Sequence, residues 1–135
     1  MKKIQIPYIT ERIWGITPPS NGIMYVVDHD EVHQIKITDE LKVSILSEEP
    51  YSFCDSLQNC LGIPKGEEIL EGNGNNIKYS FDSTQDTVCV KLTLENTKEK
   101  IIFPILSGDW FAASFSVCGC YLLLAEPYSF ELYEL

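Results

Sequence analysis

The stretch Thr87-Val88-Cys89-Val90-Lys91-Leu92-Thr93-Leu94-Glu95 decides the fold class of this chain. Its even positions are all apolar, and from position 91 onward its odd positions are charged or carry a hydroxyl. Successive side chains of a β-strand point to opposite faces of a sheet, so this period of two predicts a strand with one buried face.

The same alternation recurs on both sides of that stretch, at 77–82, 100–106, 111–117 and 128–133. Short runs rich in Gly, Asn, Asp and Ser separate the segments, and connections this short join antiparallel strands. The sequence therefore predicts an all-β, mainly antiparallel fold of about ten strands in meander or hairpin order. That many strands in one small domain form a small β-sandwich or close into a barrel.

Residues 52–61 follow a different pattern, which predicts one short helix. Ser52 and Asp55 have the spacing of a capping box, and Gly62 supplies a stop. Apolar residues then recur at helical spacing, at Phe53, Leu57, Cys60 and Leu61. We find no linker or low-complexity tract, so residues 1–135 are expected to form a single all-β domain.

Residues 115–125, Phe-Ser-Val-Cys-Gly-Cys-Tyr-Leu-Leu-Leu-Ala, resemble the inner hairpin of a β-propeller blade. A complete propeller has four or more blades of four strands, which is more than this chain can supply. The resemblance therefore implies a hairpin at 115–125 and names no family.

The charge of the chain is strongly acidic, with a formal net charge of −10 on 135 residues. No lysine or arginine follows Lys100, although Asp109, Glu126, Glu131 and Glu134 lie beyond it. Such a field repels nucleic acid and anionic membranes and attracts basic proteins. We therefore expect a basic protein partner, and neither a nucleic-acid nor a membrane partner.

The N-terminus and the cysteines favour a cytoplasmic location. The chain begins with two lysines but no long apolar run follows them, so no signal peptide is expected. An odd number of cysteines argues against a complete disulfide framework, so free thiols are expected at Cys54, Cys60, Cys89, Cys118 and Cys120.

The sequence Asp28-His29-Asp30-Glu31-Val32-His33 contains both histidines of the chain and three carboxylates, which are ligands that transition metals accept. A metal-dependent enzyme centred on His29 and His33 is therefore one hypothesis. The alternative is a partly buried His33 satisfied by a hydrogen bond, next to a solvated turn at Asp28, Asp30 and Glu31. No other motif predicts a catalytic residue or a cofactor, because the chain lacks a phosphate-binding loop and a nucleophile elbow.

Recognition residues are expected near the C-terminus. If Phe111, Ala113 and Phe115 point inward, Trp110 points outward with Ala112, Ser114 and Ser116, and Tyr133 points outward beside Glu131. Exposed Trp and Tyr are enriched at interface hot spots. The candidate partner-binding residues are Asp109, Trp110, Glu126, Glu131, Tyr133 and Glu134, with a second acidic cluster at Asp28, Asp30 and Glu31.

The leading hypothesis is a non-enzymatic acidic protein-binding module. A small cytosolic inhibitor or immunity-type protein of a toxin–antitoxin pair fits it, because basic toxins select acidic inhibitors. A barrel that carries a small apolar ligand and the metal-dependent enzyme at His29 and His33 are the alternatives. The sequence leaves the identity of the partner and the oligomeric state open.

Overall fold

The computed structural model describes residues 1–7 and 11–135, and these residues form thirteen strands and one helix. The strands are β1 (Lys2–Ile4), β2 (Gly15–Ile16), β3 (Ile23–Val27), β4 (Val32–Lys36), β5 (Lys42–Leu46), β6 (Leu61–Gly62), β7 (Glu71–Gly72), β8 (Asn75–Asp82), β9 (Thr87–Leu94), β10 (Thr97–Pro104), β11 (Ala112–Phe115), β12 (Tyr121–Glu126) and β13 (Ser129–Glu134). All pairings of these strands are antiparallel, so the predicted all-β fold is confirmed.

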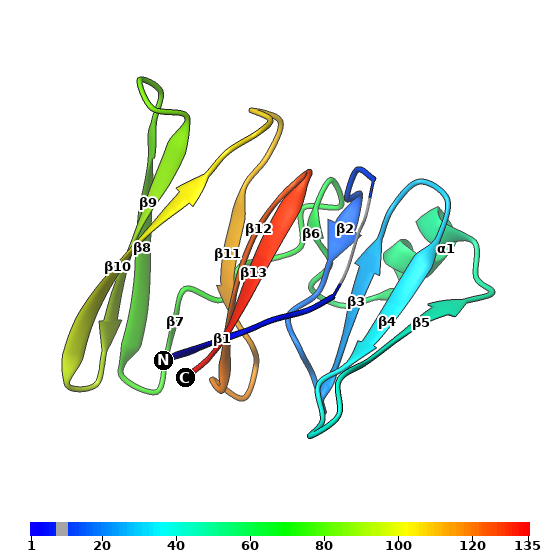
Figure 1. The fold of residues 1–135 in the computed structure, drawn as a ribbon, viewed down its shortest axis with the longest axis horizontal. Helices are drawn as coiled ribbons and strands as arrows, with labels where there is room; N and C mark the ends of the chain where they lie inside the picture. The colour runs from blue at the N-terminus through cyan, green and yellow to red at the C-terminus, as the bar shows by residue number, and fades with distance from the viewer. Residues whose placement is uncertain (8–10) are drawn as a thin grey trace.

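The strands form three open sheets that stack as layers (Figure 1). The N-terminal sheet has the order β5-β4-β3-β2-β6, the central sheet β1-β13-β12-β11, and the C-terminal sheet β10-β9-β8-β7. The central sheet joins the two ends of the chain, because Lys2 of β1 pairs with Glu134 of β13. The described strands close no barrel, so the sandwich alternative is the one that fits, and the barrel interior that the carrier hypothesis required is not formed.

The central sheet is buried on both faces. Leu122 and Leu124 point into a core shared with the C-terminal sheet, whereas Leu123 and Ala125 point into a core shared with the N-terminal sheet. The first core includes Ile77, Val88, Val90, Leu92 and Phe103, and the second includes Ile13, Ile16, Met24, Val26 and Ile35. A strand covered on both sides needs apolar residues at successive positions, which is what the run of leucines in β12 supplies.

The helix α1 (Pro50–Ser56) lies where a helix is expected, but it begins and ends earlier than predicted. Its N-cap is Glu49, whose carboxylate accepts a hydrogen bond of 2.6 Å from the Ser52 N–H, and Pro50 suits the first turn. Beyond Ser56 the chain becomes extended, and Leu61 pairs with Ile16 in the N-terminal sheet. The apolar residues at the end of the predicted helix are therefore buried by strand pairing rather than by a helix face.

The helix covers the outer face of the N-terminal sheet through a third apolar cluster of Val27, Val32, Cys54 and Cys60. The sulfur atoms of Cys54 and Cys60 are 2.6 Å apart and pack against Gly15, where a Cβ atom would lie 2.5 Å from the Cys60 sulfur. Among the residues that the structure describes, no helix has the length and apolar character needed to cross a bilayer.

The hairpins of the C-terminal sheet are set by residues that accept a positive φ. Asn73 and Gly74, with φ of 53° and 77°, form the two-residue turn between β7 and β8, which is the geometry of a type I′ hairpin. Asp86, with φ of 51°, ends the turn between β8 and β9. Figure 1 shows that the turn between β8 and β9 reaches beyond the central sheet. The central sheet therefore does not cover the end of β8.

Candidate protein-interaction site

The predicted outward orientation of Trp110 is wrong. Its ring is partly buried against the core of the N-terminal sheet and lies next to Gly62, where a Cβ atom would be 3.2 Å from it. Its indole Nε1 is buried and has no hydrogen-bond partner within residues 1–7 and 11–135. The prediction failed because Ala112, Ser114 and Ser116 do not form a solvent face; all three are buried between the layers.

Glu126 is a structural carboxylate and not part of an external acidic surface. It is fully buried, and its Oε1 accepts hydrogen bonds from the N–H groups of Leu106 (2.8 Å) and Ser107 (3.2 Å). Its Oε2 accepts from the N–H of Tyr128. These bonds attach the connection between β10 and β11 to the end of β12, so the predicted surface position of Glu126 is wrong.

The two histidines contact different partners. The exposed His29 lies with its Nδ1 2.9 Å from the Tyr51 hydroxyl. The buried His33 has its Nε2 3.2 Å from a carboxylate oxygen of Asp28 and 3.5 Å from one of Glu31. The hydrogen bond expected for a partly buried His33 is present, although the residue is more deeply buried than predicted, whereas the expected solvation of Asp28 is wrong, because Asp28 is only 5% exposed.

Within the part of the chain that the structure describes, Asp28, Glu31 and His33 are the residues that could hold a cation, since their ligand atoms all lie within 4.8 Å of one another. Asp28 is already committed to the turn between β3 and β4, because its Oδ1 accepts from the N–H groups of Asp30 (2.8 Å) and Glu31 (2.7 Å). The geometry thus serves the turn, and it does not bring the two imidazoles to one centre as the metal hypothesis required.

The C-terminal acids have counter-charges that come from the other end of the chain. Arg12 forms an ion pair with Asp109, and the Lys3 ammonium lies 3.7 Å from Glu131. Tyr133 packs against the core of the C-terminal sheet and its hydroxyl donates to Glu131, so burial and this carboxylate raise the pKa of the phenol. Only Glu134, among these predicted acids, is exposed without an ion pair in the described part of the chain.

Sequence reasoning missed a groove between the end of β8 and the connection from β10 to β11. This aromatic groove has a volume of about 320 Å³ and is lined by Tyr79, Ser80, Phe81, Val88, Ile105, Ser107, Gly108, Trp110 and Phe111. Tyr79 and Phe111 meet edge to face, with ring centroids 5.0 Å apart. Phe81 is 57% exposed, although its alternation with Ile77 and Tyr79 predicted a buried position.

The outer edge of β8 is open along this groove. The Ile77 N–H donates to the Leu70 carbonyl (2.8 Å), outside the ladder with β9, so the backbone N–H and C=O of Ile77 point away from β9 while its side chain stays in the core. Hydrogen-bonding direction alternates along an antiparallel pair, so the N–H and C=O of Tyr79 and Phe81 face outward too, whereas those of Ser80 face β9. Within the described residues no backbone group pairs with the outward groups of Tyr79 and Phe81.

Carboxylates lie near this edge. Asp82 is the exposed last residue of β8 and Asp86 lies in the exposed turn that follows, and hydrogen bonds from the hydroxyl and N–H of Thr84 lower the pKa of Asp82. Glu68 accepts a hydrogen bond of 2.8 Å from the Tyr79 hydroxyl and one of 2.7 Å from the Ala113 N–H. Burial and Glu68 raise the pKa of Tyr79 to about 12, so its phenol stays a neutral donor at neutral pH.

Comparison of the chain with protein-family models, curated proteins and solved structures found no match. What the protein binds is therefore inferred from the geometry and charge of these surfaces alone.

Proposed function

We propose that this protein is a non-enzymatic binding module that docks a basic protein partner at the aromatic groove. In this proposal an extended segment of the partner adds as a strand to the outer edge of β8. The open edge carries the proposal: the backbone groups of Tyr79 and Phe81 face away from β9, next to an apolar groove. In strand addition, backbone hydrogen bonds supply affinity and pockets for alternate side chains supply specificity.

The rest of the C-terminal sheet supports this choice of edge. Exposed strand edges promote unwanted pairing, and proteins protect them with charges or proline. The edge strand β10 has this protection, with Lys98, Glu99, Lys100 and Pro104 along it. The segment of β8 at Tyr79 and Phe81 carries aromatic rings instead, which suits an edge that is used for binding.

Charge supports the basic character of the partner. The chain has a net charge of −10, Asp82 ends β8 at the open edge, and Asp86 lies in the exposed turn that follows. Acidic groups at the rim of an interface speed the encounter with a basic partner and orient it. A cytosolic inhibitor or immunity-type protein that neutralises a basic toxin fits these features, and the free cysteines suit the reducing cytoplasm.

Selection from a displayed library of random ten-residue peptides tests the proposal. We expect the selected peptides to alternate apolar residues with lysine or arginine, and to shift the NMR signals of Tyr79, Phe81 and Phe111. Peptides that bind at the pocket bounded by Thr17, Tyr25 and Asn59 instead would contradict the proposed site.

A matched pair of double variants measures the contribution of Asp82 and Asp86 to binding. Asp82→Asn combined with Asp86→Asn should weaken peptide binding by about tenfold at low salt, and by less at high salt, because rim charges are screened. The control, Asp39→Asn combined with Glu40→Gln, makes the same change in net charge at exposed positions next to the N-terminal sheet. Equal loss of binding in the two double variants would show that only the net charge of the protein matters. It would contradict a local role of Asp82 and Asp86 in binding.

A further inference from the structure

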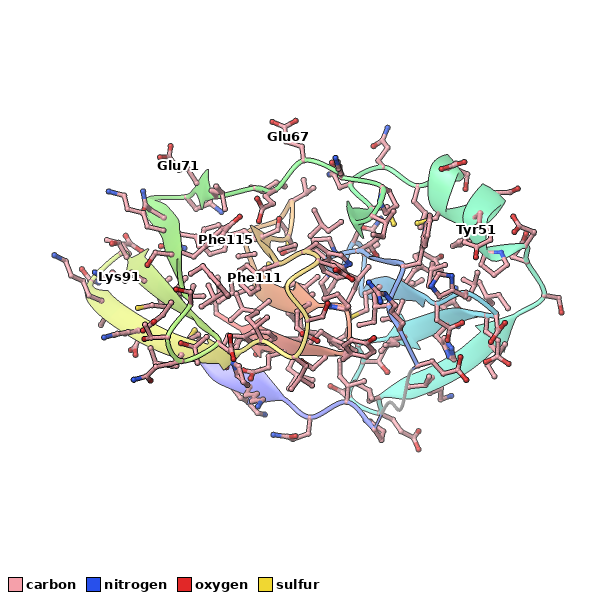
Figure 2. All side chains as sticks on the ribbon, turned by 90° about the horizontal axis from the view of Figure 1, so that it is seen from above. Tyr51, Glu67, Glu71, Lys91, Phe111 and Phe115 are labelled. Atoms are coloured by element: carbon pink, nitrogen blue, oxygen red, sulfur yellow. The ribbon has the colours of Figure 1, made fainter. Side chains whose placement is uncertain are left out.

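The outer face of the C-terminal sheet gathers lysines on a chain that is acidic overall. Lys91 of β9 is directly opposite Lys78 of β8 on one side and Lys100 of β10 on the other. Lys98 projects from the same face of β10, and all four side chains are exposed. Figure 2 shows Lys91 on the outer side of this sheet, away from Phe111 and Phe115. Four of the ten cationic side chains of the protein thus share one face.

Folding does not explain this lysine face. Like charges directly opposite each other on neighbouring strands destabilise a sheet. In residues 1–7 and 11–135 no carboxylate lies within ion-pair distance of Lys78, Lys91, Lys98 or Lys100. A row of three lysines without counter-ions, on a protein with twenty acidic residues, is instead suited to an anionic ligand.

The lysines line a groove of about 330 Å³, together with Asn76, Leu92, Thr93 and Glu99. The amide of Asn76 and the hydroxyl of Thr93 add hydrogen-bond donors that phosphate oxygens accept. Neighbouring strands are ~4.8 Å apart, so the three lysines in register span about 10 Å. That length matches a short chain of phosphate groups better than a single phosphate ion.

We propose that this groove binds an oligophosphate, either free inorganic triphosphate or the phosphate chain of a nucleotide. Salt screens interactions between exposed charges that are more than ~10 Å apart. A compact anion in the groove therefore interacts mainly with the nearby lysines and less with the distant acidic groups. A long nucleic acid also meets the repulsion of the net charge of −10, and the groove lining has no aromatic ring on which bases stack. This site is separate from the aromatic groove, so it does not depend on the proposed function.

Titration with inorganic triphosphate, followed by NMR and calorimetry, tests this proposal. We expect signal shifts at Lys78, Lys91 and Lys100, and affinity that falls as salt is raised. The variant Lys91→Gln with Lys100→Gln should lose at least tenfold in affinity. Its control, Lys36→Gln with Lys42→Gln, removes another exposed lysine pair that is directly opposite across two strands and makes the same change in net charge.

A loss of less than twofold in the control supports the lysine face, whereas equal losses in the two variants overturn it. Thermal melts of both variants establish that each remains folded. A parallel titration with ATP distinguishes the two sources: tighter binding than triphosphate indicates a nucleotide, and equal binding indicates free oligophosphate. Tighter binding of a twelve-nucleotide single-stranded DNA than of triphosphate would overturn the proposal in favour of nucleic acid.

Discussion

Leu123 and Leu124 are consecutive residues of β12, and their fully buried side chains lie in different hydrophobic cores. Leu123 packs towards the N-terminal sheet and Leu124 towards the C-terminal sheet. The central sheet is therefore the layer that holds the other two together, and damage to either of its faces should affect the stability of the whole protein.

The variants Leu123→Ala and Leu124→Ala test this arrangement. Each should lower the free energy of unfolding by about 2–5 kcal/mol, because each leaves a cavity in a separate core. Val117→Ala, at a position 75% exposed, is the control and should change it by less than about 0.5 kcal/mol. Urea denaturation measures all three values. A three-layer core is ruled out if either leucine variant behaves like the control.

Proline substitution tests the direction of the backbone groups in β8. Ser80→Pro removes an N–H that points to β9, so it should destabilise the protein by about 2 kcal/mol or more. Phe81→Pro removes an N–H that points away from β9. Edge strands tolerate proline at such positions, because no hydrogen bond between strands is lost. The variant Phe81→Ala is the control for loss of the side chain. The free energies of unfolding of Phe81→Pro and Phe81→Ala, measured by urea denaturation, should therefore differ by less than about 1 kcal/mol. Equal destabilisation by the two proline variants would show that both N–H groups are paired.

The phenol of Tyr79 makes the stability of the protein depend on pH in the alkaline range. Burial and Glu68 raise its pKa to about 12, above the value of about 10 in an unfolded chain. The folded state then binds the proton more tightly, so this stabilisation is complete below pH ~10 and is lost as the pH rises towards 12.

Tyr79→Phe should accordingly flatten the fall in unfolding free energy above pH ~10, measured by urea denaturation at a series of pH values. Tyr133 has a pKa shifted in the same direction, so the difference between wild type and variant isolates the contribution of Tyr79. Parallel curves for the two proteins would contradict a perturbed Tyr79.

The alternation at 87–95 was enough to predict β9 and its buried residues Val88, Val90 and Leu92, all of which lie in a core. Alternation shows that one face of a strand is buried, but not what covers it, so three layers were not predicted. The run from Leu122 to Ala125 contained the missing signal, because an unbroken apolar run is typical of a strand buried on both faces.

The candidate site was harder to predict because it depends on relations between distant segments. Phe81 has the same alternation as the buried Ile77, and it is exposed because its end of β8 extends beyond the central sheet. The row of Lys78, Lys91 and Lys100 arises from the register of three strands. Net charge predicted an acidic surface and gave no sign of this basic face.

Amide hydrogen exchange, measured by NMR with and without a selected basic peptide, tests strand addition at β8 most directly. In the free protein the amides of Tyr79 and Phe81 should exchange rapidly, while that of Ser80 is protected by its bond to β9. Bound peptide should slow Tyr79 and Phe81 by at least tenfold and leave Ser80 unchanged. Unaltered exchange at Tyr79 and Phe81 in a saturated complex would contradict the proposed function.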